Sequence, residues 1–315
     1  MPRRRTVLLL ILLSVVGLGI LSFLTLVMLR GSLYDDEHAA RCLRVACVTM
    51  TCDVGPTVNR ARMLDMVRVI KRAHPDVELI LFGEAVTGWY SVGAETKEYR
   101  RRIAESVPGE TTAMMSTAAK ELRTYLCFGL TELSGERTYN SQVLIDPAGV
   151  ITAVHRKVNL QGATTFAPGS VPVTMADIKG VRTAIIICSD IQSSAVRKEL
   201  GAQTPDLILG SLANPSDPNW FISGLIAKLF DAWILTANRY GPDGAQFFDG
   251  QMIIADPLGQ LRVKAKDQAQ YIYYVIGFDG GRSPARRFLG RLYVWESLGL
   301  HMIKNIGTML SLTRS

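Results

Sequence analysis

The amino-acid sequence predicts an α/β fold in which strands alternate with helices. Runs rich in β-branched residues recur between segments whose apolar side chains have helical spacing. Residues 184–187 are apolar at four consecutive positions, which is typical of a strand buried on both faces. With 48% hydrophobic and 20% charged residues, the chain has the composition of a globular protein and not of a disordered one.

The N-terminal segment predicts a membrane anchor. No charged side chain occurs from Thr6 to Leu29, and residues 7–29 are long enough to cross a hydrocarbon core of about 30 Å as a helix. A cleaved signal peptide is the alternative, but its apolar stretch is usually about 7 to 15 residues and ends at small residues. We therefore expect residues 1–30 to form a cytoplasmic stub with a single transmembrane helix, and residues 31–42 to form a linker.

Positive charge is concentrated at the ends of the chain. The net charge of +7 divides into +3 for residues 1–44, −1 for residues 45–281 and +5 for residues 282–315. The near-neutral body argues against a nucleic-acid partner. Arginines precede the apolar run and acidic residues follow it, so the positive-inside tendency places the N-terminus in the cytoplasm and the later domain outside the cytoplasm.

Residues 43–281 predict one domain of alternating elements. Helices are expected at residues 57–73, 95–105 and 111–123. Strands are expected at residues 43–51, 77–82, 125–132, 181–187, 206–211 and 233–238. Two hairpins are expected around D-P-x-G turns, at residues 139–157 and 249–265. This interleaving favours sheets covered by helices, with functional sites at strand ends.

Three of the predicted strand ends carry side chains with complementary chemistry. Glu84 follows the strand at residues 77–82, Lys157 ends the first hairpin, and Cys188 comes where the buried strand stops. Singly, they have ordinary interpretations as a loop acid, a surface lysine and an inert buried cysteine. Together they supply a thiol, a base for its proton and a cation for an oxyanion. A helix start after Cys188 is expected to lower the pKa of the thiol.

The cysteines do not predict a disulfide framework or a metal site. Their number is odd, five in all, and the chain is long enough to bury a core without cross-links. Cys47 and Cys127 alternate with apolar residues and are expected in the core, whereas a bond between Cys42 and Cys52 is left open. Without metal-type C-x-x-C spacing or a His/Cys cluster, neither a metal nor another cofactor is expected.

At these residues the chain resembles the nitrilase, or carbon–nitrogen hydrolase, superfamily. The order and spacing of Glu84, Lys157 and Cys188 are similar to the Glu-Lys-Cys triad of that family. Linked motifs agree with it: YNSQVLIDPAGVITAVHRKVNL at 139–160, FAPG at 166–169, TANRYG at 236–241 and DGQMIIADPLGQ at 249–260. The resemblance covers residues 43–281 and implies a nitrilase-like α-β-β-α sandwich as the catalytic domain.

The resemblance also implies a role for each residue of the triad. Cys188 is the implied nucleophile, Glu84 the general base and later acid, and Lys157 the group that stabilises the tetrahedral intermediate. The backbone amide of Ser189 is the implied second oxyanion donor. Ser189 stands where family members often have an aromatic residue, and Gly83 stands where a proline is usual.

The remaining surroundings of the triad indicate a changed substrate with retained chemistry. Many family members carry a second glutamate after the lysine, whereas residues 159–165 contain no acid, and Gln161 is expected to occupy similar space. Tyr90 and Trp220 are candidate substrate-lining aromatics, with simple packing as the alternative. Residues 282–315 form a basic amphipathic pattern that predicts a helix on the membrane surface or packed against a second subunit of a homodimer.

The resemblance predicts a membrane-anchored carbon–nitrogen hydrolase of the amidase type. It would act through a thioester on Cys188, on an amide or nitrile in a small molecule or a lipid-linked substrate. The triad does not distinguish water from an amine as acceptor, so an N-acyltransferase similar to the catalytic domain of apolipoprotein N-acyltransferases is an alternative. A catalytically silent nitrilase-like scaffold is the second alternative.

Overall fold

The computed structural model describes residues 39, 41–90, 96–161, 165–215, 219–244, 246–265 and 270–278. The expected anchor and the expected C-terminal tail lie outside these residues, as does most of the expected linker. No helix within the described ranges is long and apolar enough to cross a membrane.

The chain divides into two compact units. One comprises Met1–Cys42 with Val275–Gly281, and the other comprises Leu43–Tyr274 with Arg282–Ser315. In the first unit the backbone amide of Phe278 donates to the carbonyl oxygen of Arg41 at 2.8 Å. The guanidinium of Arg41 also lies 5.4 Å from the centre of the Phe278 ring. The second unit contains the second sheet described below, all the helices, and the first sheet except for Cys42 of β1 and Val275–Gly277 of β14.

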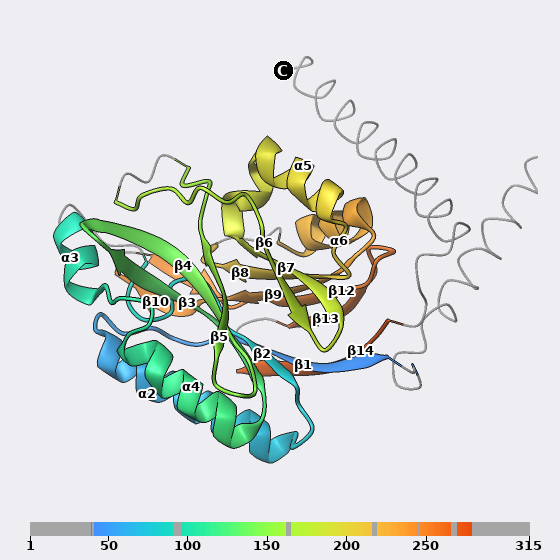
Figure 1. The fold of residues 1–315 in the computed structure, drawn as a ribbon, viewed down its shortest axis with the longest axis horizontal. Helices are drawn as coiled ribbons and strands as arrows, with labels where there is room; N and C mark the ends of the chain where they lie inside the picture. The colour runs from blue at the N-terminus through green and yellow to red at the C-terminus, as the bar shows by residue number, and fades with distance from the viewer. Residues whose placement is uncertain are drawn as a thin grey trace, which may run out of the picture. The chain divides into compact units, whose positions relative to one another are not determined.

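Two six-stranded sheets form the framework, in the orders β14-β1-β2-β3-β4-β5 and β13-β12-β9-β8-β7-β6 (Figure 1). The first sheet comprises β1 (Cys42–Val48), β2 (Leu79–Leu81), β3 (Tyr125–Ser134), β4 (Arg137–Ile145), β5 (Ile151–Arg156) and β14 (Tyr271–Gly277). The second comprises β6 (Thr174–Ile178), β7 (Val181–Ile187), β8 (Leu207–Leu212), β9 (Trp233–Asn238), β12 (Met252–Ala255) and β13 (Leu261–Ala265). A separate hairpin joins β10 (Tyr240–Asp243) to β11 (Gln246–Asp249).

Helices cover the outer face of each sheet. Helices α2 (Pro56–Ala73) and α4 (Glu110–Leu122) lie over the first sheet, and α5 (Ser194–Gln203) and α6 (Asn219–Phe230) lie over the second (Figure 1). A shorter helix, α3 (Thr96–Ile103), precedes α4. The sheets meet on their inner faces, where the hydroxyl of Ser211 on β8 donates to the carbonyl of Phe82 at 3.1 Å. The predicted α-β-β-α sandwich is therefore confirmed.

Each helix layer seals its own apolar core. Met63, Val67 and Ile70 of α2 and Met115 of α4 pack with the residues of β1 to β4 that face the helices. On the other side, side chains of α5 and α6 pack with residues of β7, β8, β9 and β12. Strands β1, β2, β7 and β8 are covered on one face by helices and on the other by the opposite sheet. This arrangement explains their nearly continuous apolar sequences.

The strand directions bring several carboxyl ends to the same edge. Strands β1, β2 and β3 run parallel, as do β7, β8 and β9. Strand β5 is antiparallel to β4, which is antiparallel to β3, so β5 runs in the direction of β2. The residues that follow β2 and β5 therefore share one edge of the first sheet.

Most predicted elements occur close to their expected positions, including both hairpins with D-P-x-G turns. Strands β6, β10, β11 and β14 were not predicted. Strand β6 is a half-buried edge strand without clear alternation, which makes its sequence signal weak. The helix expected directly after Cys188 is instead a five-residue 3₁₀ helix, Cys188–Gln192, and α5 begins only at Ser194.

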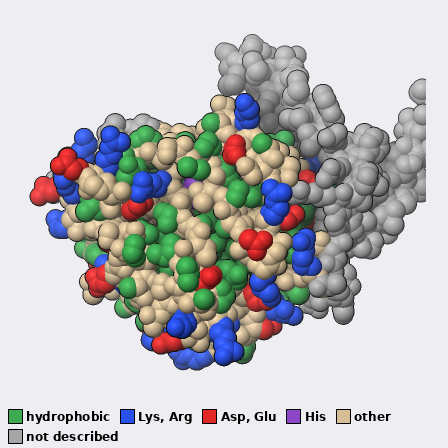
Figure 2. Space-filling view, in the orientation of Figure 1, with side chains coloured by type: hydrophobic (Ala, Val, Ile, Leu, Met, Phe, Trp, Pro, Cys, Tyr) green, Lys and Arg blue, Asp and Glu red, His purple; other side chains and the backbone are tan. Residues whose placement is uncertain are grey.

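The five cysteines all lie in the described part of the chain, and no disulfide bond joins any of them. Cys47 and Cys127 are buried in the core as predicted. Burial raises the pKa of Cys127 to about 12, so its thiol is an inert core group. On the face shown in Figure 2, basic and acidic side chains are interspersed around an apolar centre, as the near-neutral charge of residues 45–281 leads one to expect.

Candidate active site

Glu84 and Lys157 form a buried ion pair at the edge of the first sheet. The ammonium of Lys157 donates to Oε1 of Glu84 at 2.5 Å, and neither side chain is more than 3% exposed. Cys188 follows β7 in the second sheet and is half-buried. The negative charge of Glu84 raises the pKa of its thiol, and the positive charge of Lys157 lowers it. The structure thus brings together the three side chains that the sequence singles out.

Close backbone packing fixes the turn that carries Glu84. A Cβ atom on Gly129 of β3 would lie only 2.3 Å from the backbone nitrogen of Ala85, so the turn can approach β3 only because residue 129 is glycine. A Cβ atom on Gly83 would lie 3.1 Å from the backbone of Asn238. The amide of Glu84 donates to the carbonyl of Leu212 on β8 at 3.2 Å. The turn is therefore held between the two sheets.

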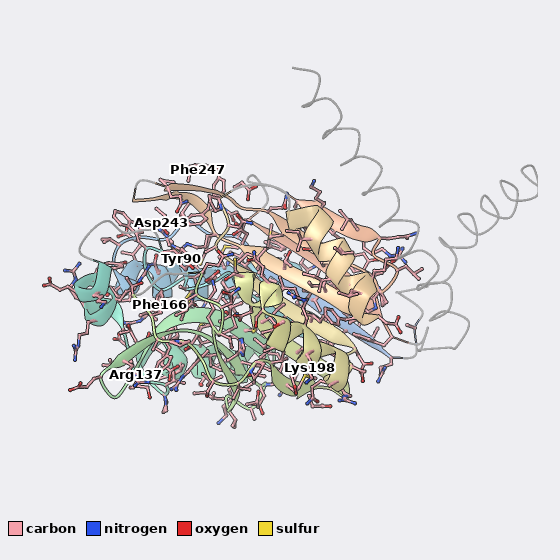
Figure 3. The ribbon with its side chains drawn as sticks, turned by 90° about the horizontal axis from the view of Figure 1, so that it is seen from above. Tyr90, Arg137, Phe166, Lys198, Asp243 and Phe247 are labelled. Atoms are coloured by element: carbon pink, nitrogen blue, oxygen red, sulfur yellow. The ribbon has the colours of Figure 1, made fainter. Side chains whose placement is uncertain are left out.

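A buried arginine holds the carbonyl groups of the same turn. Arg239 is 1% exposed and donates to the carbonyl oxygens of Glu84, Ala85 and Gly88 at 3.1, 2.6 and 2.8 Å. Its guanidinium also pairs with Asp243 of β10. Asp243 in turn accepts a hydrogen bond from the backbone amide of Tyr90 at 2.8 Å, and Figure 3 shows these two residues as neighbours. Arg239 therefore positions the chain from Glu84 to Tyr90.

The two carboxylate oxygens of Glu84 have different surroundings. Oε1 accepts from Lys157 and also from the side-chain amide of Asn140 on β4 at 2.6 Å. Oε2 is buried and has no hydrogen-bond partner among the described residues. A buried carboxylate oxygen without a hydrogen-bond partner costs folding free energy, so its presence calls for a functional explanation. Here Oε2 is available to receive a proton.

The electrostatic surroundings keep Lys157 positively charged. Burial by itself lowers the pKa of Lys157, but the negative charge of Glu84, the interactions with Cys188 and Tyr90, and the hydrogen bond to Glu84 together outweigh burial and raise the pKa overall. The ammonium also donates to the hydroxyl of Tyr90 at 3.3 Å. Burial and the charge of Glu84 raise the pKa of Tyr90, so its hydroxyl keeps its proton at neutral pH.

The thiol of Cys188 is protonated at neutral pH. Burial, followed by the negative charge of Glu84, raises the pKa of Cys188 to about 12, although Lys157 and the backbone amide of Ala213 act in the opposite direction. The expectation of a lowered pKa is therefore wrong. Only a short 3₁₀ helix begins at Cys188. Its backbone amides do not lower the pKa of the thiol enough to offset burial and the charge of Glu84. Cys188 also has a φ of +45°, a rare conformation for a residue other than glycine, which is common at functional sites.

Asp190 joins the turn after β7 to the chain that follows Lys157. Its Oδ1 accepts from the backbone amides of Val158 and Asn159 at 2.9 and 2.8 Å. Its Oδ2 accepts from the amide of Ile187 at 3.0 Å and lies 3.0 Å from Nε2 of the buried His155. The carboxylate thus connects the backbone before Cys188 to the backbone after Lys157 and to the side chain of His155.

A pocket of about 300 Å³ opens beside Cys188. Cys188, Lys157 and Tyr90 line one side of it, together with Ser189 and Ala213. Polar side chains of Gln161, Gln192 and Asn214 also line the pocket. Its remaining lining is mostly apolar and comes from β7, β8, β9, α6, the 3₁₀ helix after β7 and the loop after β8: Ile186, Ile191, Gly210, Leu212, Pro215, Ile222, Ser223, Ile226, Ile234 and Thr236.

The other candidate residues differ in their relation to the pocket. The hydroxyl of Ser189 donates to the carbonyl of Asn159 at 2.6 Å, so this side chain holds the loop after Lys157. The amide of Gln161 donates to Gln192 at 2.7 Å and does not contact Glu84 or Lys157. The side chain of Trp220, in α6, lies outside the described part of the structure. Among the described residues, no group of three or more His, Cys, Asp or Glu side chains is arranged to hold a metal ion.

Sequence reasoning missed Asn140, Asp190 and Arg239. Asn140 and Arg239 lie inside quoted motifs, Asp190 lies two residues after Cys188, and each is a polar residue within or beside an apolar strand. Asn140 and Arg239 are no more than 1% exposed, and Asp190 is fully buried. A polar side chain in a buried strand must have a partner, and this was the signal available in the sequence. The identity of that partner required the fold.

Comparison with known proteins agrees with the geometry. The family model described as carbon-nitrogen hydrolase matches residues 44–280. The chain is 27% identical over 212 residues to a nitrilase of Pyrococcus abyssi, covering 65% of this chain and 79% of the relative. It is 28% identical over 207 residues to an (R)-stereoselective amidase of a Pseudomonas species, covering 62% and 72%.

Solved structures share the fold at lower sequence identity. A carbon–nitrogen hydrolase superfamily protein from Xanthomonas campestris has a TM-score of 0.67 at 20% identity, covering 80% of this chain and 95% of that protein. An amidase from Nesterenkonia sp. AN1, solved as a cysteine-to-alanine mutant with butyramide, has a TM-score of 0.64 at 19% identity. That match covers 78% of this chain and 96% of the amidase.

We expect alkylation of Cys188 by iodoacetamide to keep accelerating as the pH rises through 9, without a plateau near neutrality, because the pKa of the thiol is raised to about 12. Replacing Glu84 by Gln removes a negative charge that raises this pKa. The alkylation profile of Glu84→Gln should therefore shift to lower pH. Glu121→Gln, on the exposed surface of α4, is the control and should leave the profile unchanged. A plateau near pH 7 in the wild type would contradict the protonated resting thiol.

Substitution of Asp190 by Asn should lower both stability and turnover. The side-chain amide of asparagine would place an N–H group against backbone N–H donors that now bind the Asp190 carboxylate. A buried hydrogen-bonding group left unsatisfied costs about 1–3 kcal/mol. Asp256→Asn is the matched control, because Asp256 is equally buried and accepts from the backbone amides of Leu258 and Gln260 in the β12–β13 turn. Urea unfolding should show a similar loss for both variants. Only Asp190→Asn should lower kcat of the folded fraction, and equal effects on kcat would contradict a positioning role.

Proposed function

Because the chain belongs to the carbon–nitrogen hydrolase family, we propose that it cleaves a non-peptide amide through a thioester on Cys188, with Glu84 and Lys157 as its partners. The coarser function follows from the family and its members: the protein is an enzyme of the amidase and nitrilase type. The observation that carries the proposal is the buried Lys157–Glu84 pair beside a thiol at the edge of a pocket.

In the acylation half, the thiol of Cys188 loses its proton to Oε2 of Glu84 as the sulfur attacks the amide carbonyl carbon. The carbon–sulfur bond forms, and the carbonyl electron pair moves onto oxygen. The ammonium of Lys157 stabilises this oxyanion, and the backbone amide of Ser189 is the second donor. The oxyanion then collapses, the carbon–nitrogen bond breaks, and Glu84 gives its proton to the departing amine. The result is an acyl thioester on Cys188, a free amine and the ionised carboxylate of Glu84, which is ready to act as a base again.

In the deacylation half, Glu84 takes a proton from water as the water oxygen attacks the thioester carbon. The carbon–sulfur bond breaks, and the proton returns from Glu84 to the sulfur. The products are a carboxylic acid and the free thiol, so the enzyme returns to its starting state. If an amine replaces water as acceptor, the same steps give a new amide. That alternative, an N-acyltransferase, is favoured only if the substrate is presented at a membrane.

A membrane location belongs to the same proposal. The uncharged run from Thr6 to Leu29 and the arginines before it support an anchor with the N-terminus in the cytoplasm and the catalytic domain outside it. The cationic segment at residues 282–315 supports a contact with lipid or with a second subunit. The proposed substrates are therefore amides of small molecules or of lipid-linked molecules near the membrane surface.

We expect rapid quenching during turnover of a short aliphatic amide to give an intact mass increased by one acyl group. Peptide mapping should place this group on Cys188, and Cys188→Ala should carry none.

Glu84→Gln should lower kcat by about 10²- to 10⁴-fold through loss of proton transfer. Lys157→Met should lower it by about 10²- to 10³-fold through loss of oxyanion stabilisation. Lys198→Met, on the exposed surface of α5 (Figure 3), is the control and should match the wild type. Turnover by Cys188→Ala would refute the thioester mechanism.

Expression of the full chain should place the protein in the membrane fraction, and alkaline carbonate washing should not release it. Deletion of residues 1–30 should move the protein to the soluble fraction if the N-terminal run is the main attachment. Protease added to spheroplasts or sealed vesicles reports on which side the catalytic domain lies. Release of the full chain by carbonate would contradict an integral anchor, and protection of the domain from external protease would contradict the proposed orientation.

A further inference from the structure

We propose that the apolar end of the pocket beside Cys188 binds an uncharged aliphatic acyl chain, so that the enzyme prefers medium-length aliphatic amides to very small or cationic ones. The inference rests on the proposed function, since it assumes that the acyl carbon becomes attached to Cys188. It adds a substrate class and names the residues that select it.

The floor of this acyl pocket is a row of residues on three neighbouring strands. Ile186 of β7 pairs with Gly210 of β8, and Gly210 pairs with Thr236 of β9. All three line the pocket, so their side-chain positions face α6. Gly210 has no side chain, and it therefore leaves a depression between its two larger neighbours. A Cβ atom there would lie 3.3 Å from Cγ2 of Thr236, so an added methyl group would crowd the floor beside Thr236.

The walls of the acyl pocket are apolar and buried. Ile226 of α6 packs with Ile186 and Ile234 in the core beneath the helix. These three side chains are 7%, 3% and 1% exposed. The polar Gln161 and Gln192 are exposed in contrast, so they belong to the mouth of the pocket. The pocket therefore changes from a polar, exposed mouth to a buried interior that is mainly apolar, with the hydroxyl groups of Ser223 and Thr236 as its polar groups.

This buried end suits the acyl group better than the amine. The acyl group stays on Cys188 after the first half of the reaction, whereas the amine must leave and water must enter. An amine bound behind the thioester would be trapped under α6. A released amine is also protonated near neutral pH, and an unpaired ammonium is costly in apolar surroundings. Among the described residues that line the pocket there is no carboxylate that could pair with an ammonium, and the one charged group is Lys157.

The volume limits the length of the chain. A methylene group has about the volume of a water molecule, about 30 Å³ in the liquid. A pocket of about 300 Å³ therefore holds at most about ten non-hydrogen atoms, including those of the amide. We expect amides with chains of roughly four to eight carbons to fit best, because each buried methylene adds favourable transfer free energy until the space is filled.

The test compares kcat/KM for acetamide, butyramide, heptanamide and dodecanamide. Values should rise by about fourfold per methylene at first and then fall once the chain exceeds the pocket. A second comparison uses 6-aminohexanamide, which has an ammonium where heptanamide has a methyl group. Its kcat/KM should be at least about tenfold lower than that of heptanamide.

Two variants change the pocket in opposite directions. Gly210→Ala places a methyl group on the floor, so the heptanamide-to-acetamide ratio of kcat/KM should fall by about tenfold or more. Ile226→Ala enlarges the wall and should move the optimum to longer chains. Gly201→Ala, an exposed position in α5 with no atom within 4 Å of the added Cβ, is the control and should keep the wild-type ratio. Thermal unfolding identifies any variant that has failed to fold.

The outcomes separate this inference from the proposed function. If acetamide forms a thioester but the rate is independent of chain length and unaffected by Gly210→Ala, the acyl pocket is wrong and the thioester chemistry stands. If no amide is turned over, the thioester proposal fails, and calorimetry on Cys188→Ala still tests the pocket. Binding of heptanamide at least tenfold more tightly than 6-aminohexanamide would support the pocket, and equal binding would overturn it.

Discussion

The contact between the ammonium of Lys157 and the carboxylate of Glu84 is the interaction on which the rest of the site depends. Two buried charges are stable only when they pair closely and their remaining polar atoms are satisfied, and removal of one partner costs about 3–5 kcal/mol. The fold pairs Glu84 with Lys157 where the carboxyl ends of β2 and β5 share an edge, while Oε2 of Glu84 has no hydrogen-bond partner among the described residues. Asn140 and Arg239 then fix the carboxylate and its turn.

The same pair determines how the thiol reacts. Burial and the negative carboxylate of Glu84 raise the pKa of the Cys188 thiol, so the resting enzyme stores no thiolate. The nucleophile arises only as its proton moves to Glu84 during attack. Lys157 remains positively charged and is in place when the oxyanion forms. Preorganised charge of this kind is worth most in a buried site, where little reorganisation is needed during the reaction.

The sequence predicted most of the fold because its strands are buried on both faces and its hairpins contain D-P-x-G turns, which are strong local signals. It predicted the candidate triad because Glu84, Lys157 and Cys188 each end a recognisable strand. The partners of these residues depend on distant contacts. Asp190 bonds to residues more than 30 positions away, and Arg239 holds a turn 155 positions away. The pKa of Cys188 was misjudged because it is raised by burial and by Glu84, a carboxylate from the other sheet. The depression at Gly210 depends on which strands flank β8.

The central claim, a common acyl-enzyme on Cys188, is tested most directly by partitioning with hydroxylamine. Two substrates with the same acyl group and different leaving groups, hexanamide and hexananilide, are turned over at a fixed hydroxylamine concentration. A shared thioester predicts the same ratio of hexanohydroxamate to hexanoic acid from both, whatever their individual rates. A ratio that depends on the leaving group would contradict a common intermediate and the account built on it.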